Sequence, residues 1–307
     1  MPPAHEDAAI HAFLRGNPSE QLAWLRARGL PAATLLALHN PCAQRCFFCA
    51  GPGTVSVPEA ERTSRNAAFA QLQARPPGVT RLMIGGNEPT LHPDFAVLLQ
   101  AARPAGFTTL ELMTNGADLG VHAATWAGLG VTEVIVPLYA ASAPLHDGVC
   151  GAVCFDRVVS GLDAAFAAGI RVSIHTLLLR RTLGELPALA AFVHQRWGTR
   201  LGVALLRDKG SFDFAGEAPA FADARQAVNA VPEPLRPFGI GTPRCLDAAV
   251  VEAPLVAELY FRSQVRSYGP GCFGCRLREG CGGVVDAYVG EVHPGDARGP
   301  ISPVRGG

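Results

Sequence analysis

Three cysteines near the start of the chain have a spacing that suits a metal cluster. Cys42, Cys46 and Cys49 form a C-x3-C-x2-C pattern, and the aromatic Phe48 precedes the third cysteine. A cubane iron–sulfur cluster normally takes four thiolates, so three cysteines leave one iron with an open coordination position. Zinc sites usually combine paired cysteine elements into four ligands, which fits this trio poorly. The spacing therefore predicts an iron–sulfur cluster with one iron available for chemistry.

This pattern resembles the signature of the radical S-adenosylmethionine (SAM) enzymes, in which an aromatic residue stands just before the third cysteine. In that family SAM chelates the open iron, and one electron cleaves it to methionine and a 5′-deoxyadenosyl radical that abstracts a substrate hydrogen atom. The resemblance implies that Cys42, Cys46 and Cys49 hold a [4Fe-4S] cluster and that Phe48 lies at the SAM site.

A glycine-rich motif follows the next apolar run. Gly85, Gly86, Asn87 and Glu88 resemble the Gly-Gly-Glu motif of the family, which binds the SAM amino group. Glycine lets the backbone approach a ligand closely, and a carboxylate accepts hydrogen bonds from an ammonium group. Because Asn87 interrupts the motif, either the last three residues are the working triplet or the loop is one residue longer. An ordinary strand–helix turn is the alternative.

Polar residues further along the chain are also candidates for the SAM site. Thr114 and Asn115, before Gly116, resemble the family's segment near the SAM ribose and methionine. A plain Asn-Gly turn is the alternative reading of that segment. His175, inside an apolar run, is a candidate contact to SAM or substrate, and a buried structural histidine fits the pattern equally well.

Two cysteines lie outside both metal motifs. Cys150 and Cys154 fall in a segment that resembles the one after the fourth strand in peptide-modifying members of the family. Their i, i+4 spacing would suit one helix face, although the sequence does not predict a helix there. One of them could return a hydrogen atom to a substrate radical. Further on, Arg180 and Arg181 either meet a substrate carboxylate or form a solvated loop pair.

A second group of cysteines lies in the C-terminal part. Cys272, Cys275 and Cys281 form a C-x2-C-x5-C pattern, and Cys245 upstream is a candidate fourth thiolate. The arrangement resembles the SPASM/twitch extensions of radical SAM enzymes. The SPASM pattern continues with another cysteine, so the shorter twitch form and a second, fully ligated [4Fe-4S] cluster are implied. Four cysteines would suit a zinc ion equally well.

The elements that must position these motifs alternate between strand-like and helix-like patterns. Apolar strand candidates lie at residues 33–39, 81–84, 109–113, 131–139, 171–179 and 201–206. Strand–helix alternation predicts an α/β protein with parallel strands. A closed eight-stranded barrel needs ~250 residues, so six units predict a partial (β/α)6 TIM-like barrel with its chemistry at the carboxyl ends of the strands. Pro137 is awkward inside a parallel strand because it lacks an N–H group.

The predicted organisation has five parts. A helical lead-in at 1–32 precedes the barrel at 33–210, and a connector at 211–240 leads to a twitch-like iron–sulfur domain at 241–294 and a flexible tail at 295–307.

Composition excludes several classes of protein. Hydrophobic residues make up 49% of the 307 residues, charged residues 17%, and the formal net charge is +0, which predicts a packed protein. A neutral chain argues against nucleic-acid and anionic membrane partners. There is neither a signal-peptide pattern nor an apolar run of ~18 residues. The odd number of cysteines, nine, favours metal ligation over disulfides and predicts a cytoplasmic location.

The resemblance implies modification of a ribosomally synthesised peptide by crosslinking, epimerisation or oxidation. Only some thirty residues precede the barrel, which leaves a separate peptide-recognition protein or a small-metabolite substrate as options. A flavodoxin or ferredoxin would supply the electron. The alternative from another class is a non-catalytic zinc-binding interaction module.

Overall fold

The computed structural model describes residues 13, 16–27, 29–49, 62–206, 212–246, 266–267, 281 and 284–285. They belong to two compact units. The first unit contains the described residues of 7–137 and 147–173, and the second unit contains those of 138–146 and 174–307. Within these described residues, no helix has the length and apolar character needed to cross a membrane.

The first unit is built on four parallel strands. They are β1 (Thr34–Leu38), β2 (Arg81–Gly86), β3 (Thr109–Met113) and β4 (Val131–Pro137). Each pairs in parallel with the next, and Leu38 at the end of β1 lies opposite Gly86 at the end of β2. All five residues of β1 are buried. Such continuous burial is typical of a parallel strand that is covered on both faces.

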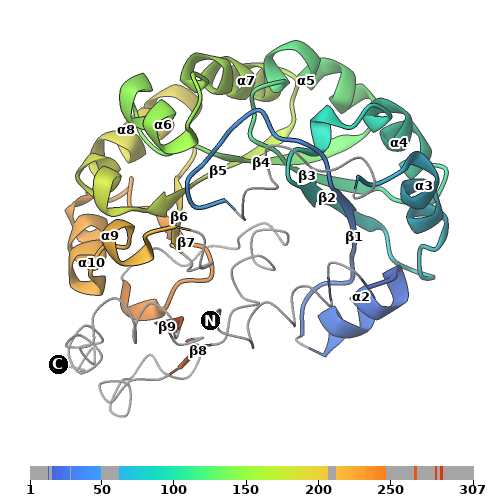
Figure 1. Ribbon diagram of the computed structural model, residues 1–307, viewed down its shortest axis with the longest axis horizontal. Coiled ribbons are helices and arrows are strands. Elements are labelled where there is room, and N and C mark those ends of the chain that lie inside the picture. Colours follow the sequence, from blue (N-terminus) through green and yellow to red (C-terminus); the bar gives the residue numbers. More distant parts are fainter. Residues whose placement is uncertain are drawn as a thin grey trace. The chain divides into compact units, whose positions relative to one another are not determined.

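One helix precedes β1 along the chain, and others follow each of the four strands. They are α2 (Pro18–Arg26), α3 (Arg65–Gln73), η2 (Pro89–Leu91), α4 (Phe95–Ala102), α5 (Leu119–Gly128), α6 (Ala143–Cys150) and α7 (Phe155–Ala167). In Figure 1, α3, α4, α5 and α7 lie along one side of β1–β4. Helix α5 begins at Leu119, and Leu119, Ala123 and Trp126 are buried at helical spacing.

Strand β4 shows how the sheet accommodates a proline. Pro137 is the last residue of β4, so its missing N–H group lies at the end of the strand. An interior position would have removed a ladder hydrogen bond. The proline that is awkward inside a parallel strand is therefore accommodated where the strand ends.

The second unit continues the same alternation. Its elements are β5 (Arg171–Leu178, which begins in the first unit), η3 (Arg180–Glu185), α8 (Leu186–Trp197), β6 (Gly202–Leu205), α9 (Phe214–Glu217), α10 (Phe221–Ala230), β7 (Phe238–Gly239), η4 (Arg244–Leu246), β8 (Arg266–Ser267) and β9 (Val284–Val285). Strands β8 and β9 pair antiparallel. The expected connector at 211–240 holds two helices and a strand, because Phe238 and Gly239 pair in parallel with β6.

The strands follow the chain order β1-β2-β3-β4-β5-β6-β7 in a seven-stranded sheet. Successive parallel strands joined by helices are the plan of a partial βα barrel. The predicted α/β class and barrel plan are therefore confirmed, with β7 as a strand beyond the six expected.

The outer edge of β1 is covered by a side chain. Buried Gln21 on α2 donates from Nε2 to the Leu35 carbonyl oxygen (3.1 Å) and accepts from the Leu35 N–H group (2.8 Å). Asn17 and Glu20 begin α2 with a reciprocal capping box, which fixes the start of the helix. The glutamine amide thus makes both of the hydrogen bonds that a neighbouring strand would offer at Leu35.

Charged side chains cross the strands of the first unit. Glu111 on β3 is fully buried and forms an ion pair with Arg81 on β2. Glu133 lies opposite Glu111 in the β3–β4 register, and Arg171 lies 3.1 Å from its carboxylate. Burial raises the pKa of Glu133, while the charges of Arg171 and Arg81 act in the opposite direction. Each carboxylate thus has an arginine, as burial of a charge requires.

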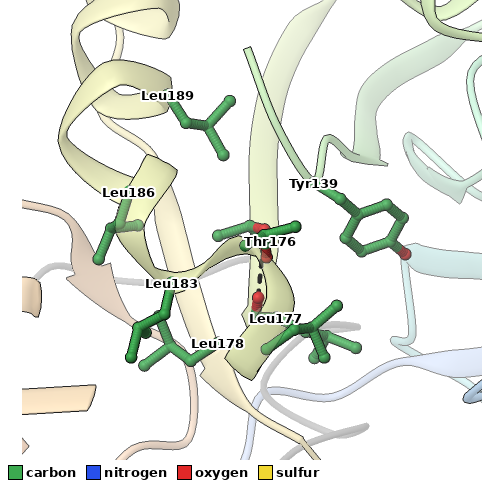
Figure 2. Close-up of a pocket in the computed structure, with 9 residues that line it drawn as sticks. Tyr139, Thr176, Leu177, Leu178, Leu183, Leu186 and Leu189 are labelled. Atoms are coloured by element: carbon green, nitrogen blue, oxygen red, sulfur yellow. Dashed lines mark hydrogen bonds between the residues drawn. The ribbon is translucent and has the colours of Figure 1, made fainter. Parts of the chain in front are cut away.

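A small apolar pocket lies in the second unit, between β5, η3 and the start of α8 (Figure 2). It is lined by Tyr139, Thr176, Leu177, Leu178, Leu179, Thr182, Leu183, Leu186 and Leu189. Its volume of about 10 Å³ is far below the roughly 300 Å³ of typical ligand pockets. Its lining carries no carboxylate, thiol or imidazole, so it lacks the groups that acid–base or metal chemistry requires.

Candidate active site

The cysteine trio lies on the loop that leaves β1. Cys42, Cys46 and Cys49 are all half-buried, and the Cys49 N–H group donates to the Cys46 carbonyl oxygen at 2.9 Å. Phe47 and Phe48 stand edge to face with ring centroids 5.1 Å apart. The turn therefore brings the last two cysteines of the motif close in space, next to an aromatic pair.

Gly86 lets the end of β2 approach the start of this loop. Its φ of +131° is outside the range that residues with a side chain usually adopt, and a Cβ atom there would lie 2.1 Å from the Leu38 carbonyl oxygen. At Gly85 a Cβ atom would meet only the Leu35 side chain, at 3.8 Å. Glycine is therefore required by geometry at the second of the two positions. Asn87 is half-buried beside it.

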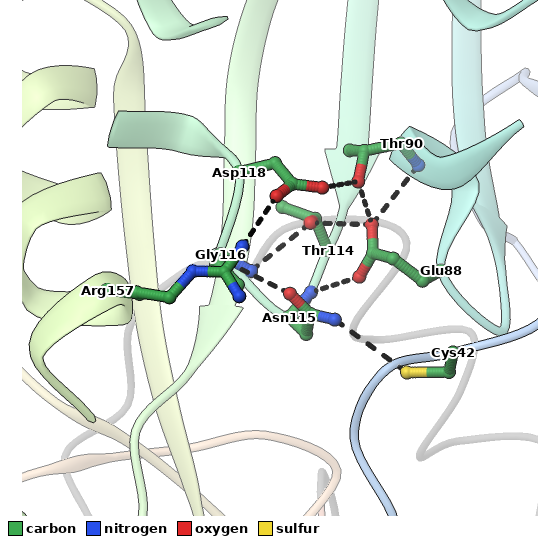
Figure 3. A network of polar contacts seen from close by, with 9 residues as sticks. Cys42, Glu88, Thr90, Thr114, Asn115, Gly116, Asp118 and Arg157 are labelled. Carbon is green, nitrogen blue, oxygen red and sulfur yellow. Dashed lines mark hydrogen bonds and ion pairs between the residues drawn. The ribbon is translucent and has the colours of Figure 1, made fainter. Parts of the chain in front are cut away.

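Glu88 is the buried carboxylate of the site, with 1% of its surface exposed. Its Oε1 accepts hydrogen bonds from the Thr90 N–H group (3.2 Å), the Thr90 hydroxyl (2.7 Å) and the Thr114 hydroxyl (2.8 Å). Its Oε2 accepts from the Asn115 N–H group at 2.7 Å. Figure 3 shows these donors converging on Glu88 from η2 and from the end of β3. The carboxylate is therefore held in one orientation by two strand ends.

Two opposing effects act on the charge of Glu88. Burial raises its pKa above the ordinary value, and the hydrogen bonds from Asn115, Thr90 and Thr114 work in the opposite direction. Burial is the larger effect, so the carboxylate lies in surroundings that favour a positively charged partner.

Asn115 connects Glu88 to the cysteine loop. Its backbone N–H group donates to Glu88, and its side-chain Nδ2 approaches Cys42 Sγ at 3.7 Å. Its Oδ1 accepts from the Ala117 N–H group at 2.9 Å, which fixes which way the amide points. The asparagine therefore presents a donor, rather than an acceptor, to the sulfur.

A second layer of polar residues supports this contact chain. The Thr90 hydroxyl lies 3.3 Å from Asp118 Oδ2, and Arg157 on α7 lies 2.9 Å from Asp118 Oδ1. Sequence reasoning missed these three residues. Thr90 was detectable as the hydroxyl two residues after the glutamate, whereas Asp118 and Arg157 meet only through the packing of α5 on α7.

The cysteine loop has the donor chemistry that an iron–sulfur cluster requires. Burial raises the pKa of Cys42 to about 11, and the negative charge of Glu88 adds to this, whereas the Gln44 N–H group and Asn115 lower it. A thiol with this pKa keeps its proton at neutral pH, and metal binding must displace that proton. The three cysteine sulfurs of this loop, with amide donors directed at Cys42, fit a metal cluster.

The other residues expected near SAM lie in the second unit. His175 on β5 is buried, and burial lowers its pKa to about 4, so the imidazole is neutral at pH 7. Arg181 forms an ion pair with Glu217 of α9, and Arg180 donates to backbone carbonyls, including the Ala218 carbonyl at 2.8 Å. Both arginines are exposed, in keeping with a solvated loop pair, and their guanidinium groups contact α9.

Cys150 and Cys154 do not share a helix face, although their i, i+4 spacing would suit one. Cys150 is the last residue of α6, and Cys154 is the N-cap of α7, because the chain turns at Gly151 with φ +61°. Their sulfurs still lie within 4.8 Å of one another, and both residues are buried.

The C-terminal cysteines are only partly described. Cys245 lies on η4 and is buried, and Cys281 is half-buried. Cys272 and Cys275 lie outside the described residues.

Comparison with known proteins places this site in a family. Residues 37–193, just over half of the chain, match the Radical SAM superfamily. The matched segment contains the cysteine loop, Glu88, Thr114, Asn115 and His175.

The proteins that are similar in sequence include GTP 3′,8-cyclases. A GTP 3′,8-cyclase from Edwardsiella ictaluri (strain 93-146) is 30% identical over 171 residues, 52% of this chain and 49% of that protein. One from Pectobacterium atrosepticum is 32% identical over 158 residues, 47% of this chain and 46% of that protein. The chain therefore spans about half the length of these curated relatives.

Solved structures share the fold. Streptococcus suis SuiB bound to S-adenosylmethionine superposes with a TM-score of 0.53 at 18% identity, covering 68% of this chain and 49% of SuiB. Native anSMEcpe with bound AdoMet gives a TM-score of 0.54 at 14% identity, covering 65% of this chain and 58% of that one.

Proposed function

Because this chain belongs to the radical SAM superfamily, we propose that Cys42, Cys46 and Cys49 hold its [4Fe-4S] cluster and that Glu88 binds the SAM amino group. When bound, cluster and SAM together supply the 5′-deoxyadenosyl radical that takes a hydrogen atom from the substrate. The observation that carries this proposal is the contact chain from Glu88 through Asn115 to Cys42. Asn115 thus contacts both the Glu88 carboxylate and the cysteine loop.

Each residue of the contact chain has a role in binding or orientation. Glu88 accepts from the ammonium group of SAM, and Thr90 and Thr114 fix its rotamer. A cation beside a buried carboxylate favours its charged form, so binding of the ammonium offsets the effect of burial on the pKa of Glu88. Gly86 keeps the backbone free of a side chain where the β2 loop meets β1.

Anaerobic reconstitution tests this proposal. We expect about four irons for this cluster, and 5′-deoxyadenosine when SAM and a reductant such as dithionite, flavodoxin or ferredoxin are added. The triple variant Cys42→Ala/Cys46→Ala/Cys49→Ala should lose these four irons and the product. Cys154→Ala removes a buried thiol outside the trio and should retain both. Undiminished 5′-deoxyadenosine from the triple variant would contradict the proposal.

For the substrate we propose a ribosomally synthesised peptide. The sequence around Cys150 and Cys154 resembles peptide-modifying members, and the solved structures of similar fold include SuiB bound to the precursor peptide SuiA. We also propose that a separate protein delivers the peptide.

The sequence relatives favour a second candidate, a small metabolite, because two of them are GTP 3′,8-cyclases at 30% and 32% identity. The rate of 5′-deoxyadenosine formation separates the two. Peptides encoded by short reading frames beside the gene should raise this rate, and GTP should leave it unchanged. A GTP-dependent increase with no response to the peptides would favour the metabolite.

We propose that Cys245, Cys272, Cys275 and Cys281 hold a second [4Fe-4S] cluster. The support is the C-x2-C-x5-C spacing with an upstream cysteine, together with a first motif that already requires cluster loading. We expect about eight irons per chain, falling to about four in Cys272→Ala/Cys275→Ala. Stoichiometric zinc that disappears in this variant would assign the site to zinc.

A further inference from the structure

Gln44, which lies between the first two cysteines of the trio, has a buried amide beside Cys46. Only 6% of its surface is exposed, and its Oε1 lies 3.6 Å from Cys46 Sγ and accepts from the thiol. Its Nε2 is also buried and has no hydrogen-bond partner among the residues that the structure describes. A buried N–H group without a partner costs free energy, so this atom requires an acceptor that the described residues do not provide.

Metal binding would provide that acceptor. A cysteine that ligates iron is a thiolate, which accepts hydrogen bonds and has no proton to donate. The Gln44 oxygen would then face a negative sulfur. A half-turn of the amide exchanges its oxygen and nitrogen at the same two positions. Since hydrogen bonds to charged groups are stronger than neutral ones, the exchange directs Nε2 at the Cys46 sulfur.

Cys150 offers a second donor to the same sulfur. Its buried thiol neighbours those of Cys154 and Cys46, and the Cys150 and Cys154 sulfurs lie within 4.8 Å of each other. When Cys46 ligates iron, its sulfur can only accept hydrogen bonds. The hydrogen bonds among the three sulfurs must therefore all run towards Cys46. Cys150 donates to Cys46, and Cys154 donates to Cys150.

The backbone holds Cys150 against the cysteine loop. The Arg45 N–H group donates to the Cys150 carbonyl oxygen at 2.8 Å, and a Cβ atom on Gly151 would lie 2.8 Å from the Arg45 carbonyl oxygen. Asp147 Oδ1 accepts from the N–H groups of Cys154 (2.9 Å) and Phe155 (2.8 Å), which fixes the turn that follows. The thiol is therefore positioned by contacts that do not depend on a metal.

We propose that Gln44 and Cys150 are hydrogen-bond donors to the Cys46 sulfur in the cluster-loaded enzyme, and that they raise the reduction potential of the cluster. Donors to cluster sulfurs stabilise the more negative, reduced state. Both are positioning residues, because they act on the cluster through its ligand. This inference rests on the proposed ligation of the cluster by Cys42, Cys46 and Cys49.

The test is the midpoint potential of this cluster, measured by EPR-monitored redox titration of the holoenzyme without SAM. The relevant signal is the one that the triple cysteine variant lacks. Gln44→Leu and Cys150→Ala should each shift the one-electron equilibrium about tenfold towards the oxidised state, or about 59 mV. Cys150→Ser keeps an O–H donor, so its one-electron equilibrium should remain within threefold of that of the wild type. Gln71→Leu on α3 replaces another glutamine with a buried amide oxygen and should leave the potential unchanged.

The proposal would be overturned if Gln44→Leu and Cys150→Ala both load iron fully and both shift the one-electron equilibrium by less than twofold. If these variants do not load iron, the wild type still decides the matter. The wild-type protein is prepared with glutamine labelled with ¹⁵N at the side-chain amide. The reduced cluster should then show two hyperfine couplings, one to the ¹⁵N nucleus and one to an exchangeable proton. Absence of both couplings would contradict the proposal.

These results are distinguishable from a failure of the proposed function. A wild-type protein that binds no iron and forms no 5′-deoxyadenosine would overturn the proposed function itself. Normal iron content and product with unchanged potentials would overturn only the roles of Gln44 and Cys150.

Discussion

The Asn115 N–H group donates to Glu88 Oε2 at 2.7 Å, and this hydrogen bond joins residues that follow the neighbouring strands β2 and β3. The same asparagine reaches Cys42 on the loop after β1. Three consecutive strand ends are therefore connected through one residue, at the end of the strands where βα barrels place their chemistry.

Replacing Glu88 by glutamine should weaken SAM binding. The substitution removes the charge that the ammonium group meets and places an N–H donor among groups that already donate. Since hydrogen bonds to charged groups contribute about 1.5–3 kcal/mol, we expect the SAM Kd to rise about 10- to 100-fold in equilibrium dialysis. Glu185→Gln, at the start of α8 where the side chain makes no cap hydrogen bond, is the control. A Kd within threefold of the wild type would remove the assigned role of Glu88.

The two glycines at the end of β2 should respond differently to alanine. Gly86→Ala imposes a strained φ and brings Cβ against the Leu38 carbonyl oxygen, so the free energy of unfolding should fall by at least about 2 kcal/mol. Gly85→Ala meets only a leucine methyl group at ordinary contact distance and should change it by less than about 1 kcal/mol. Urea denaturation of the two variants makes the comparison. Equal effects would show that the close approach of β1 and β2 does not set the requirement.

Loss of Arg81 should destabilise the first unit through its partner. Arg81→Met leaves the fully buried Glu111 carboxylate without its counter-charge. Breaking a buried ion pair costs about 3–5 kcal/mol, and because a third of the Arg81 side chain is exposed we expect about 3 kcal/mol in urea denaturation. Arg65→Met breaks an exposed pair with Asp94 and should cost less than about 1 kcal/mol. Similar losses in the two variants would contradict this account of Glu111.

His175 should make stability depend on pH. Its pKa is about 4 in the folded protein and about 6.5 in the unfolded chain. Between these values the unfolded chain binds a proton that the folded protein excludes, so the free energy of unfolding decreases as the pH falls. The contribution is fully present above pH 6.5, and about 3 kcal/mol of it is lost by pH 4.

Urea denaturation across this pH range, with His175→Gln compared with wild type, measures that contribution. The difference between the two proteins should change by about 3 kcal/mol from pH 7 to pH 4. His122→Gln, at an exposed position, should follow the wild-type curve. Parallel curves for wild type and His175→Gln would show that the imidazole is not kept neutral by burial.

Local spacing together with a family resemblance selected residues that the structure brings close to one another. The cysteine trio, Glu88 and Asn115 each follow a strand of the expected parallel sheet, and such strands bring their carboxyl ends to one edge. The six expected strands are all present because apolar runs bounded by glycine or polar turns are a strong signal. The resemblance to a known family added the roles, which neither periodicity nor spacing contains.

Features that depend on tertiary packing could not be predicted from the sequence. Gln44 occupies a position that the C-x3-C spacing leaves unspecified, and only the structure shows that its buried amide nitrogen lacks a partner among the described residues. Cys150 and Cys154 have helical spacing, but the turn at Gly151 separates them into two helices. Strand β7 has only two residues, too few for a period to be recognised.

The contact between Gln21 and Leu35 has a consequence for self-association. Sheet edges with open N–H and C=O groups recruit strands from other molecules. Here a side-chain amide occupies both backbone groups of Leu35, so a foreign strand would have to displace α2 before it could bind. Helix α2 therefore protects this edge of the sheet against aggregation. A fragment that begins at β1 would expose an edge strand that can pair with other molecules.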